Sequence, residues 1–221
     1  YAFVQQDADS AEDKQPALAR AGRARARRLF LRARGYGLDG LRIAHHITVD
    51  ELRRGDDDRK KALTQIRKEQ VPLLYWTLVP WAAAISLNKR DLELVGDVPA
   101  IAALLDRAFE LDEPFDLGSL HEFALAFDSA RPGGTTPEAQ KKHYERAAAL
   151  QKGLKISAQV SYAESVLGPA QDKAGFERLL KEALAFDADA PAARDYRLAN
   201  LIAQRRARYL LAHESDLINT N

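Results

Sequence analysis

The stretch LLDRAFELD, at Leu104–Asp112, recurs twice in altered form further along the chain. HYERAAALQ at His143–Gln151 and LLKEALAFD at Leu179–Asp187 share its apolar or aromatic pair, its charged pair, its alanine and its late apolar residue. The shared alanine stands at Ala108, Ala147 and Ala183. These positions give periods of 39 and 36 residues, so a repeated unit of this length is expected to build the fold.

A period of this size with two helices per unit is typical of stacked antiparallel hairpins of the tetratricopeptide (TPR) type. The small alanine allows the two helices of a hairpin to approach closely, while the apolar residues face the next repeat. Because the strict tetratricopeptide consensus is not met, the repeats are predicted to be degenerate.

The rest of the chain also favours helices, because alternating β-branched runs are nearly absent and apolar residues recur at helical spacing. Three stripes of apolar or small residues at helical spacing are predicted to be buried, and the second consists of Leu179, Leu180, Ala183, Leu184 and Phe186. The first is Leu18, Gly22, Ala26, Leu29 and Ala33, and the last is Leu198, Leu201, Ile202, Arg205, Tyr209 and Ala212. The sequence therefore predicts an all-α fold of about nine helices.

Turn residues separate these helices without any long linker. Gly55 precedes three aspartates, Pro132–Gly134 precedes two threonines and a proline, and Gly168 precedes a proline. One all-helical, TPR-like domain is therefore expected over residues 1–221. Within it, residues 1–15 could form a poorly ordered N-terminal segment.

The composition excludes several classes of function. With 33 lysines and arginines against 32 acidic residues, the chain has no global basic field to hold a nucleic acid. It contains no cysteine, which excludes disulfides and thiolate metal sites. It contains no methionine either, so the sequence is expected to begin after a natural start, and a removed signal or lipid anchor is compatible with it.

Motifs for chemistry are incomplete. GYGLDG at Gly35–Gly40 matches the dinucleotide pattern G-x-G-x-x-G, but an arginine-rich helix stands where a strand is needed. A flexible helix end or a close crossing of helices is the favoured interpretation. His121 and Glu122 begin like a zinc-protease helix, but Leu125 stands at the position of the second histidine. No catalytic residue, metal ligand or cofactor is therefore predicted, and the protein is not expected to be an enzyme.

Arginines crowd the segment 20–34, at Arg20, Arg23, Arg25, Arg27, Arg28, Arg32 and Arg34. They surround a stripe of small residues and leucine, as in a solvated amphipathic helix, which is the favoured interpretation. A regular interleaving of aromatic residues and an overall basic charge are both missing, so a nucleic-acid helix is not expected. Lipid headgroups or an acidic partner remain open as ligands of these arginines.

The stretch VPLLYWTLVPWAAAISLN, at Val71–Asn88, has no charge and holds both tryptophans. It barely reaches the length of a membrane span and has charged flanks, so a buried helix is predicted. Pro80 removes a backbone hydrogen bond and should bend the axis, with the rings of Trp76 and Trp81 on one side. Two interpretations stay open: ordinary core, or an apolar ligand chamber that is also core.

Several motifs stand together along the chain: the Tyr-Trp pair with a second Trp, the Gly-Gly turn, SYAE at Ser161–Glu164, RLAN at Arg197–Asn200 and QRRA at Gln204–Ala207. In combination, from about Arg27 to Leu217, the sequence resembles the T-component family of TRAP transporters. The resemblance implies a periplasmic, often lipid-anchored, all-helical protein that works beside a solute-binding protein on hydrophobic ligands, sometimes as a trimer with a pore. It also implies a relative in bacterial sterol transport, on the outer-membrane side.

The combined prediction is a non-enzymatic periplasmic binding protein that shelters a lipid or sterol in an apolar cavity, anchored to a membrane by an N-terminal lipid missing from this chain. The alternative is a scaffold that docks a periplasmic solute-binding protein without binding ligand itself. A homotrimer is an expectation from the resemblance only. The predicted ligand-binding residues are Tyr75, Trp76, Leu78, Trp81, His121, Phe123, Phe127 and Tyr162.

Overall fold

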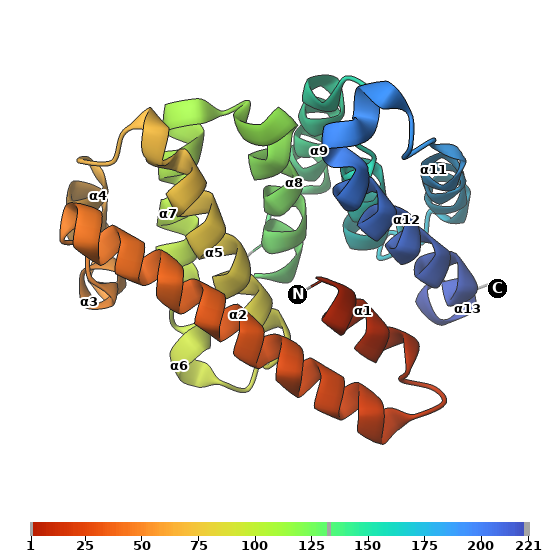
Figure 1. The fold of residues 1–221 in the computed structure, drawn as a ribbon, viewed down its shortest axis with the longest axis horizontal. Coiled ribbons are helices and arrows are strands. Elements are labelled where there is room, and N and C mark those ends of the chain that lie inside the picture. The colour runs from red at the N-terminus through yellow and green to blue at the C-terminus, as the bar shows by residue number, and fades with distance from the viewer. Residues whose placement is uncertain (1, 132–133, 219–221) are drawn as a thin grey trace. The chain divides into compact units, whose positions relative to one another are not determined.

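The computed structural model describes residues 2–131 and 134–218, and in this part of the chain every regular element is a helix (Figure 1). The predicted all-α class is confirmed. Helices outnumber the nine expected because several are very short, among them α3 (Val49–Arg53), α6 (Leu92–Val95) and α13 (Glu214–Leu217). The tetratricopeptide-like repeat stays a prediction.

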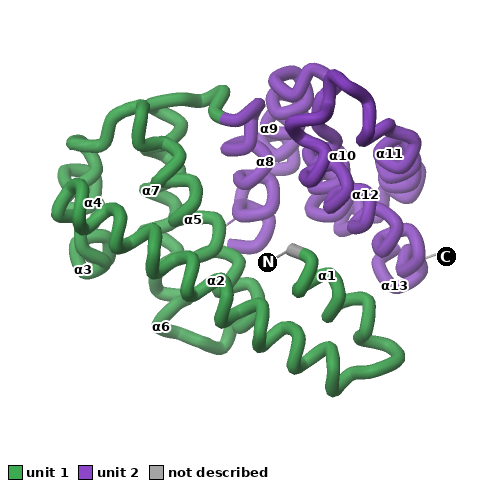
Figure 2. The backbone as a smooth tube through the Cα atoms, in the orientation of Figure 1, with its two compact units in different colours: residues 1–115 green, residues 116–221 purple. Residues whose placement is uncertain are grey.

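The chain divides into two compact units, residues 1–115 and 116–221, which Figure 2 colours separately. The first unit contains α1 (Ala2–Ser10), α2 (Pro16–His45), α3, α4 (Asp56–Leu63), the 3-10 segment η1 (Lys68–Gln70), α5 (Val71–Ser86), α6 and α7 (Val98–Asp112). The helices that follow are α8 (Phe115–Ala130), α9 (Pro137–Gln151), α10 (Ser157–Tyr162), the π-helical η2 (Ala163–Leu167), α11 (Lys173–Ala185), the 3-10 segment η3 (Pro191–Tyr196), α12 (Arg197–Ala212) and α13. That residues 1–221 form one domain remains a prediction.

The longest helix, α2, packs against α5 through two glycines of the GYGLDG motif. A Cβ atom added at Gly37 would lie 2.9 Å from the Cα of Thr77, and one added at Gly40 would lie 2.8 Å from Cδ1 of Leu73. Because glycine has no side chain, the two backbones can approach closely here. The motif is therefore a close helix crossing, as the favoured interpretation predicted, and it stands inside a helix.

Residues 2–10 form helix α1, although they were expected to belong to a poorly ordered segment. Ala8 is buried, and a Cβ atom added at Gly22 would lie 2.8 Å from the Cβ of Ala8. Arg23 on α2 also donates hydrogen bonds to Asp9, at 3.3 Å, and to Glu12. Close packing and ion pairs thus hold α1 against α2.

In the second unit, α12 packs on α11 through a face that contains polar residues. Its buried residues are Asn200, Ala203, Gln204, Ala207 and Leu210. The buried stripe that the sequence predicts to begin at Leu198 is wrong, because the Leu198 side chain is 61% exposed. Gln204 Nε2 donates to the Phe186 carbonyl at 2.7 Å, and Asn200 Oδ1 accepts from the Ile156 amide at 3.2 Å, so both amides are satisfied inside the core.

The first turn of α8 winds with the opposite hand. Asp116, Leu117 and Gly118 have φ angles of 44°, 54° and 84°, in the left-handed region. Left-handed backbone is unfavourable for residues with a side chain, so neighbouring groups must hold it in place. The buried Lys155 does so, because its Nζ donates to the Asp116 carbonyl at 3.3 Å and to Ser119 Oγ at 2.8 Å.

The three alanines of the sequence repeat, Ala108, Ala147 and Ala183, are all fully buried. At Ala147 the start of α8 approaches α9, because a Cβ atom added at Gly118 would lie 3.1 Å from the Ala147 Cα. At Ala147 a small side chain thus permits a close helix contact, as the sequence pattern predicts. Of the predicted break at Pro132–Gly134, the first two residues lie outside the described part of the chain.

Candidate functional site

Helix α5 carries both tryptophans and places them in opposite environments. Trp81 is fully buried, whereas Trp76 is 62% exposed. Five residues along an α-helix correspond to a rotation of about 140°, and both tryptophans lie within the single helix α5, Val71–Ser86. The expectation that both rings lie on one side of the helix is therefore wrong.

The Trp81 side chain is held by a group of charged residues. Its Nε1 donates to Oδ2 of Asp97 at 3.2 Å, and the Arg34 guanidinium lies over its ring, 4.3 Å from the centroid. The almost fully buried carboxylate of Asp97 also accepts from Arg53 Nε at 2.7 Å and from Arg34 Nη2 at 3.3 Å. The indole is thus fixed by one hydrogen bond and one cation–π contact.

The pKa values of Arg34 and Arg53, which share this carboxylate, shift in opposite directions. Burial lowers the pKa of Arg34, which lies deeper, and the neighbouring charge of Arg53 adds to that effect. The hydrogen bond to Asp97 raises the pKa of Arg53, whose side chain is 33% exposed. Sequence reasoning missed Asp97 and Arg34, since a lone aspartate between Gly96 and Val98 and one arginine among seven carry no signal.

Leu78, the other predicted chamber residue deep in α5, is also fully buried. Together with the polar contacts of Trp81, its burial shows that this side of α5 belongs to the interior of the first unit. A second role of Trp81 and Leu78 as the wall of a ligand chamber stays a prediction.

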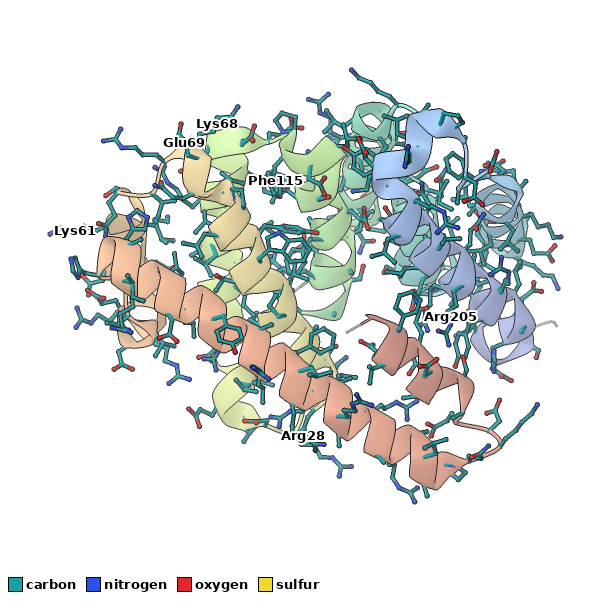
Figure 3. The ribbon with its side chains drawn as sticks, viewed as in Figure 1. Arg28, Lys61, Lys68, Glu69, Phe115 and Arg205 are labelled. Carbon is teal, nitrogen blue, oxygen red and sulfur yellow. The ribbon has the colours of Figure 1, made fainter. Side chains whose placement is uncertain are left out.

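On the other side of α5, Trp76 belongs to an aromatic cluster. The Tyr75 ring contacts Trp76 edge-on, with centroids 5.1 Å apart, and it also contacts Phe115, with centroids 5.4 Å apart. Phe115, labelled in Figure 3, was not predicted, because it follows the repeat stretch on a short connection. We refer to Tyr75, Trp76 and Phe115 as the α5 aromatic cluster.

Pro80 affects the same part of α5. Proline has no N–H, so it cannot donate the helical hydrogen bond that the carbonyl of Trp76, four residues earlier, would normally accept. Pro80 is itself buried, so the missing hydrogen bond lies beside the interior of the first unit.

In the second unit, the predicted aromatic residues form two separate pairs. The rings of Phe123 and Phe127 are stacked, with centroids 5.3 Å apart, and Phe127 is buried. Tyr162 is stacked on Tyr144, with centroids 4.3 Å apart. Burial raises the pKa of both tyrosines, so each hydroxyl stays protonated near neutral pH.

His121 contacts a histidine that the sequence did not link to it. Its Nδ1 lies 2.8 Å from Nδ1 of His143, on the neighbouring helix α9. One ring must donate and the other accept, so at least one of these nitrogens carries a proton. Burial lowers the pKa of His143, and the neighbouring His121 lowers it further. The signal for this pair is a contact between helices, which the spacing of histidines within one helix cannot reveal.

Metal ligands and membrane-spanning helices both bear on the kind of site. Across residues 2–131 and 134–218, no group of three or more histidine, aspartate or glutamate side chains is arranged to hold a metal ion. Over the same ranges, no helix combines the length and the apolar character that crossing a bilayer requires. Of the predicted ligand-binding residues, Tyr75, Trp76, Leu78 and Trp81 lie in the first unit and the other four in the second.

These observations define an all-α protein whose distinctive side chains are buried aromatics and one exposed indole. A family model described as TRAP transporter T-component matches residues 1–218, so the chain belongs to the TRAP transporter T-component family. A relative from Treponema pallidum (strain Nichols), described as an uncharacterized protein, is 28% identical over 218 residues, which cover 97% of this chain and 67% of the relative. The resemblance drawn from the motifs is confirmed, and the chain has a transport-associated role in a family of transporter components, not of enzymes.

Proposed function

We propose that this chain is a non-enzymatic, periplasmic binding component of a TRAP-type transport system, and that it binds a hydrophobic ligand such as a sterol or another lipid. The observation that supports this proposal is the α5 aromatic cluster, in which Trp76 is 62% exposed beside Tyr75 and Phe115. Core packing accounts for Trp81, but it does not account for an exposed indole in contact with a second ring.

The cluster can supply useful binding energy. An indole with this exposure leaves on the order of 150 Å² of apolar surface to be covered by a ligand, which corresponds to about 4 kcal/mol. The cost of immobilising a ligand reduces this value. The result is weak, reversible binding, which suits a carrier that must also release its ligand.

The position of the two tryptophans allows a direct test. Trp81, being buried, emits as a constant internal reference, whereas the emission of Trp76 should shift to the blue when cholesterol delivered from cyclodextrin covers it. Trp76→Ala should weaken sterol binding at least tenfold. Leu198→Ala removes a side chain of nearly equal exposure, 61%, from the second unit and should leave binding unchanged. Equal binding by both variants would overturn the assignment of the cluster.

The scaffold function is the alternative, and the same exposed indole favours it, since tryptophans often dominate protein–protein interfaces. Organic extraction of the purified protein followed by mass spectrometry separates the two functions. A co-purified lipid supports ligand binding. If no lipid is found, fluorescence is unchanged by sterol, and a periplasmic solute-binding protein is captured only when Trp76 is present, the scaffold function replaces the ligand-binding one.

A further inference from the structure

One face of α2 is exposed along almost the whole helix. Successive residues of an α-helix are about 100° apart, so eight positions between 18 and 43 fall within an arc of about 80°. All eight residues are exposed. We call this set the outer stripe, and it consists of Leu18, Ala21, Arg25, Arg28, Arg32, Tyr36, Asp39 and Ile43. At 1.5 Å per residue, the stripe is about 38 Å long.

The arginines of α2 differ according to the direction in which they point. Three on the opposite side of the helix have acidic partners in the first unit: Arg23 with Asp9, Arg27 with Asp91, and Arg34 with Asp97. Within the described ranges, Arg25 and Arg28 on the stripe form no ion pair. Figure 3 shows the side chain of Arg28 pointing outward from the helix.

The remaining polar groups of the stripe do not cancel this charge. Arg32 Nε donates to the Tyr36 hydroxyl at 2.9 Å, and its guanidinium lies over the same ring, so it keeps its positive charge. The single acid of the stripe, Asp39, is paired with Arg42 at 3.3 Å. The outer stripe therefore presents a line of positive charge to solvent.

Large apolar side chains flank these charges. Leu18 is 56% exposed, so its predicted burial in the first apolar stripe is wrong, and Tyr36 and Ile43 are 62% and 69% exposed. Three of the eight large hydrophobic residues that are exposed in the described chain thus lie on this one narrow stripe. Arginines aligned with exposed aliphatic and aromatic residues on one helix face are typical of helices that lie along a membrane surface.

We propose that the outer stripe of α2 binds the surface of an anionic lipid bilayer. Lipid phosphates would accept hydrogen bonds from Arg25 and Arg28, and the interfacial hydrocarbon would cover Leu18 and Ile43. An acidic protein segment could pair with the arginines but would leave the aliphatic ends exposed. The proposal does not depend on ligand binding at Trp76, which is on a different helix.

The test uses the purified chain and two kinds of vesicle, phosphatidylcholine alone and phosphatidylcholine with 30% phosphatidylglycerol. Co-sedimentation should show binding to the anionic vesicles at least tenfold tighter than to the neutral ones, and added salt should weaken it. Each arginine near an anionic surface contributes about 1 kcal/mol, so Arg25→Gln/Arg28→Gln should weaken binding about 30-fold. Lys60→Gln/Lys61→Gln removes the same charge from exposed positions on α4 and should change binding less than threefold.

A second variant tests the apolar part of the stripe. Ile43→Ser should weaken binding to anionic vesicles a further five- to tenfold without changing the helical circular dichroism. Equal binding by the arginine and lysine double variants would overturn the proposal. The proposal would also be overturned if the protein did not bind vesicles but bound a polyglutamate peptide through Arg25 and Arg28. That result would identify an acidic protein partner. Trp76→Ala should keep full vesicle binding, which separates this result from the ligand test.

Discussion

The indole Nε1 of Trp81 donates a hydrogen bond to the carboxylate of Asp97 at 3.2 Å, and this contact ties the middle of α5 to the residue that precedes α7. Asp97 is also the acceptor for Arg34 and Arg53, which reach it from α2 and α3. Four helical segments of the first unit therefore meet at one buried carboxylate. This arrangement predicts that the Trp81 N–H matters for stability beyond the size of the ring.

Trp81→Phe keeps an aromatic ring but removes the donor to Asp97. A buried hydrogen bond to a charged group contributes about 1.5–3 kcal/mol, and the smaller ring removes some packing, so the free energy of unfolding should fall by about 2–4 kcal/mol. Urea unfolding followed by circular dichroism measures this loss. Trp76→Phe, at the exposed position, should change stability by less than about 0.5 kcal/mol. Similar losses in both variants would contradict the arrangement.

The glycines of α2 give a matched pair of substitutions. Gly37→Ala places a methyl group against the backbone of Thr77, where none fits, and should destabilise the protein by about 1–3 kcal/mol despite the higher helix propensity of alanine. At Gly35 no atom lies within 4 Å of an added Cβ, so Gly35→Ala should stabilise the protein by about 0.5–1 kcal/mol. Thermal melting distinguishes the two. The same sign in both variants would be evidence against the close helix crossing.

Lys155 should be important for the left-handed turn of the second unit. Its ammonium group is almost fully buried and contacts Ser119 as well as the carboxylates of Asp116 and Glu122, at 3.5 and 3.8 Å. Lys155→Met leaves these groups without their cation and should lower the free energy of unfolding by about 2–4 kcal/mol. Guanidinium unfolding provides the measurement. The exposed Lys142→Met is the control and should be neutral within about 0.5 kcal/mol.

The stability of the protein should depend on pH through His143. Burial holds the pKa of this imidazole below its ordinary value of 6.5, so the unfolded chain takes up a proton at a higher pH than the folded chain does. The stabilisation is complete above that ordinary value and should be lost as the pH falls from about 7 towards about 5. Denaturant titrations at several pH values across this range give the free energy of unfolding at each pH. For His143→Gln this free energy should change less with pH than it does for the parent protein. The control is His46→Asn at an exposed site, which should keep the pH dependence of stability of the parent protein.

The all-α class, the family and the burial of the repeated alanines could be predicted from the sequence, because helical periodicity and combined motifs are local signals. The buried face of α12 could not be predicted from the sequence. Asn200 and Gln204 count as polar in any hydrophobic pattern, yet both are buried because their amides bond to backbone groups of other segments. A periodic pattern cannot include such partners, since they lie 18 to 44 residues away.

The candidate site shows the same limit. The chemical character of Trp76 and Trp81 was evident from the sequence, but their opposite environments depend on Asp97 and Arg34, which are distant in the chain. The contact between Trp76, Tyr75 and Phe115 likewise joins residues of α5 to the end of the first unit. Aromatic content could therefore be predicted, and the division between core and surface could not.

Three successive residues with positive φ at Asp116–Gly118 interrupt the screw sense of the backbone between α7 and the regular part of α8. A right-handed helix can absorb an insertion by shifting its register, but a reversed turn of fixed length cannot. Related chains that gain or lose residues should do so in other connections, and this joint should keep a constant number of residues throughout the lineage.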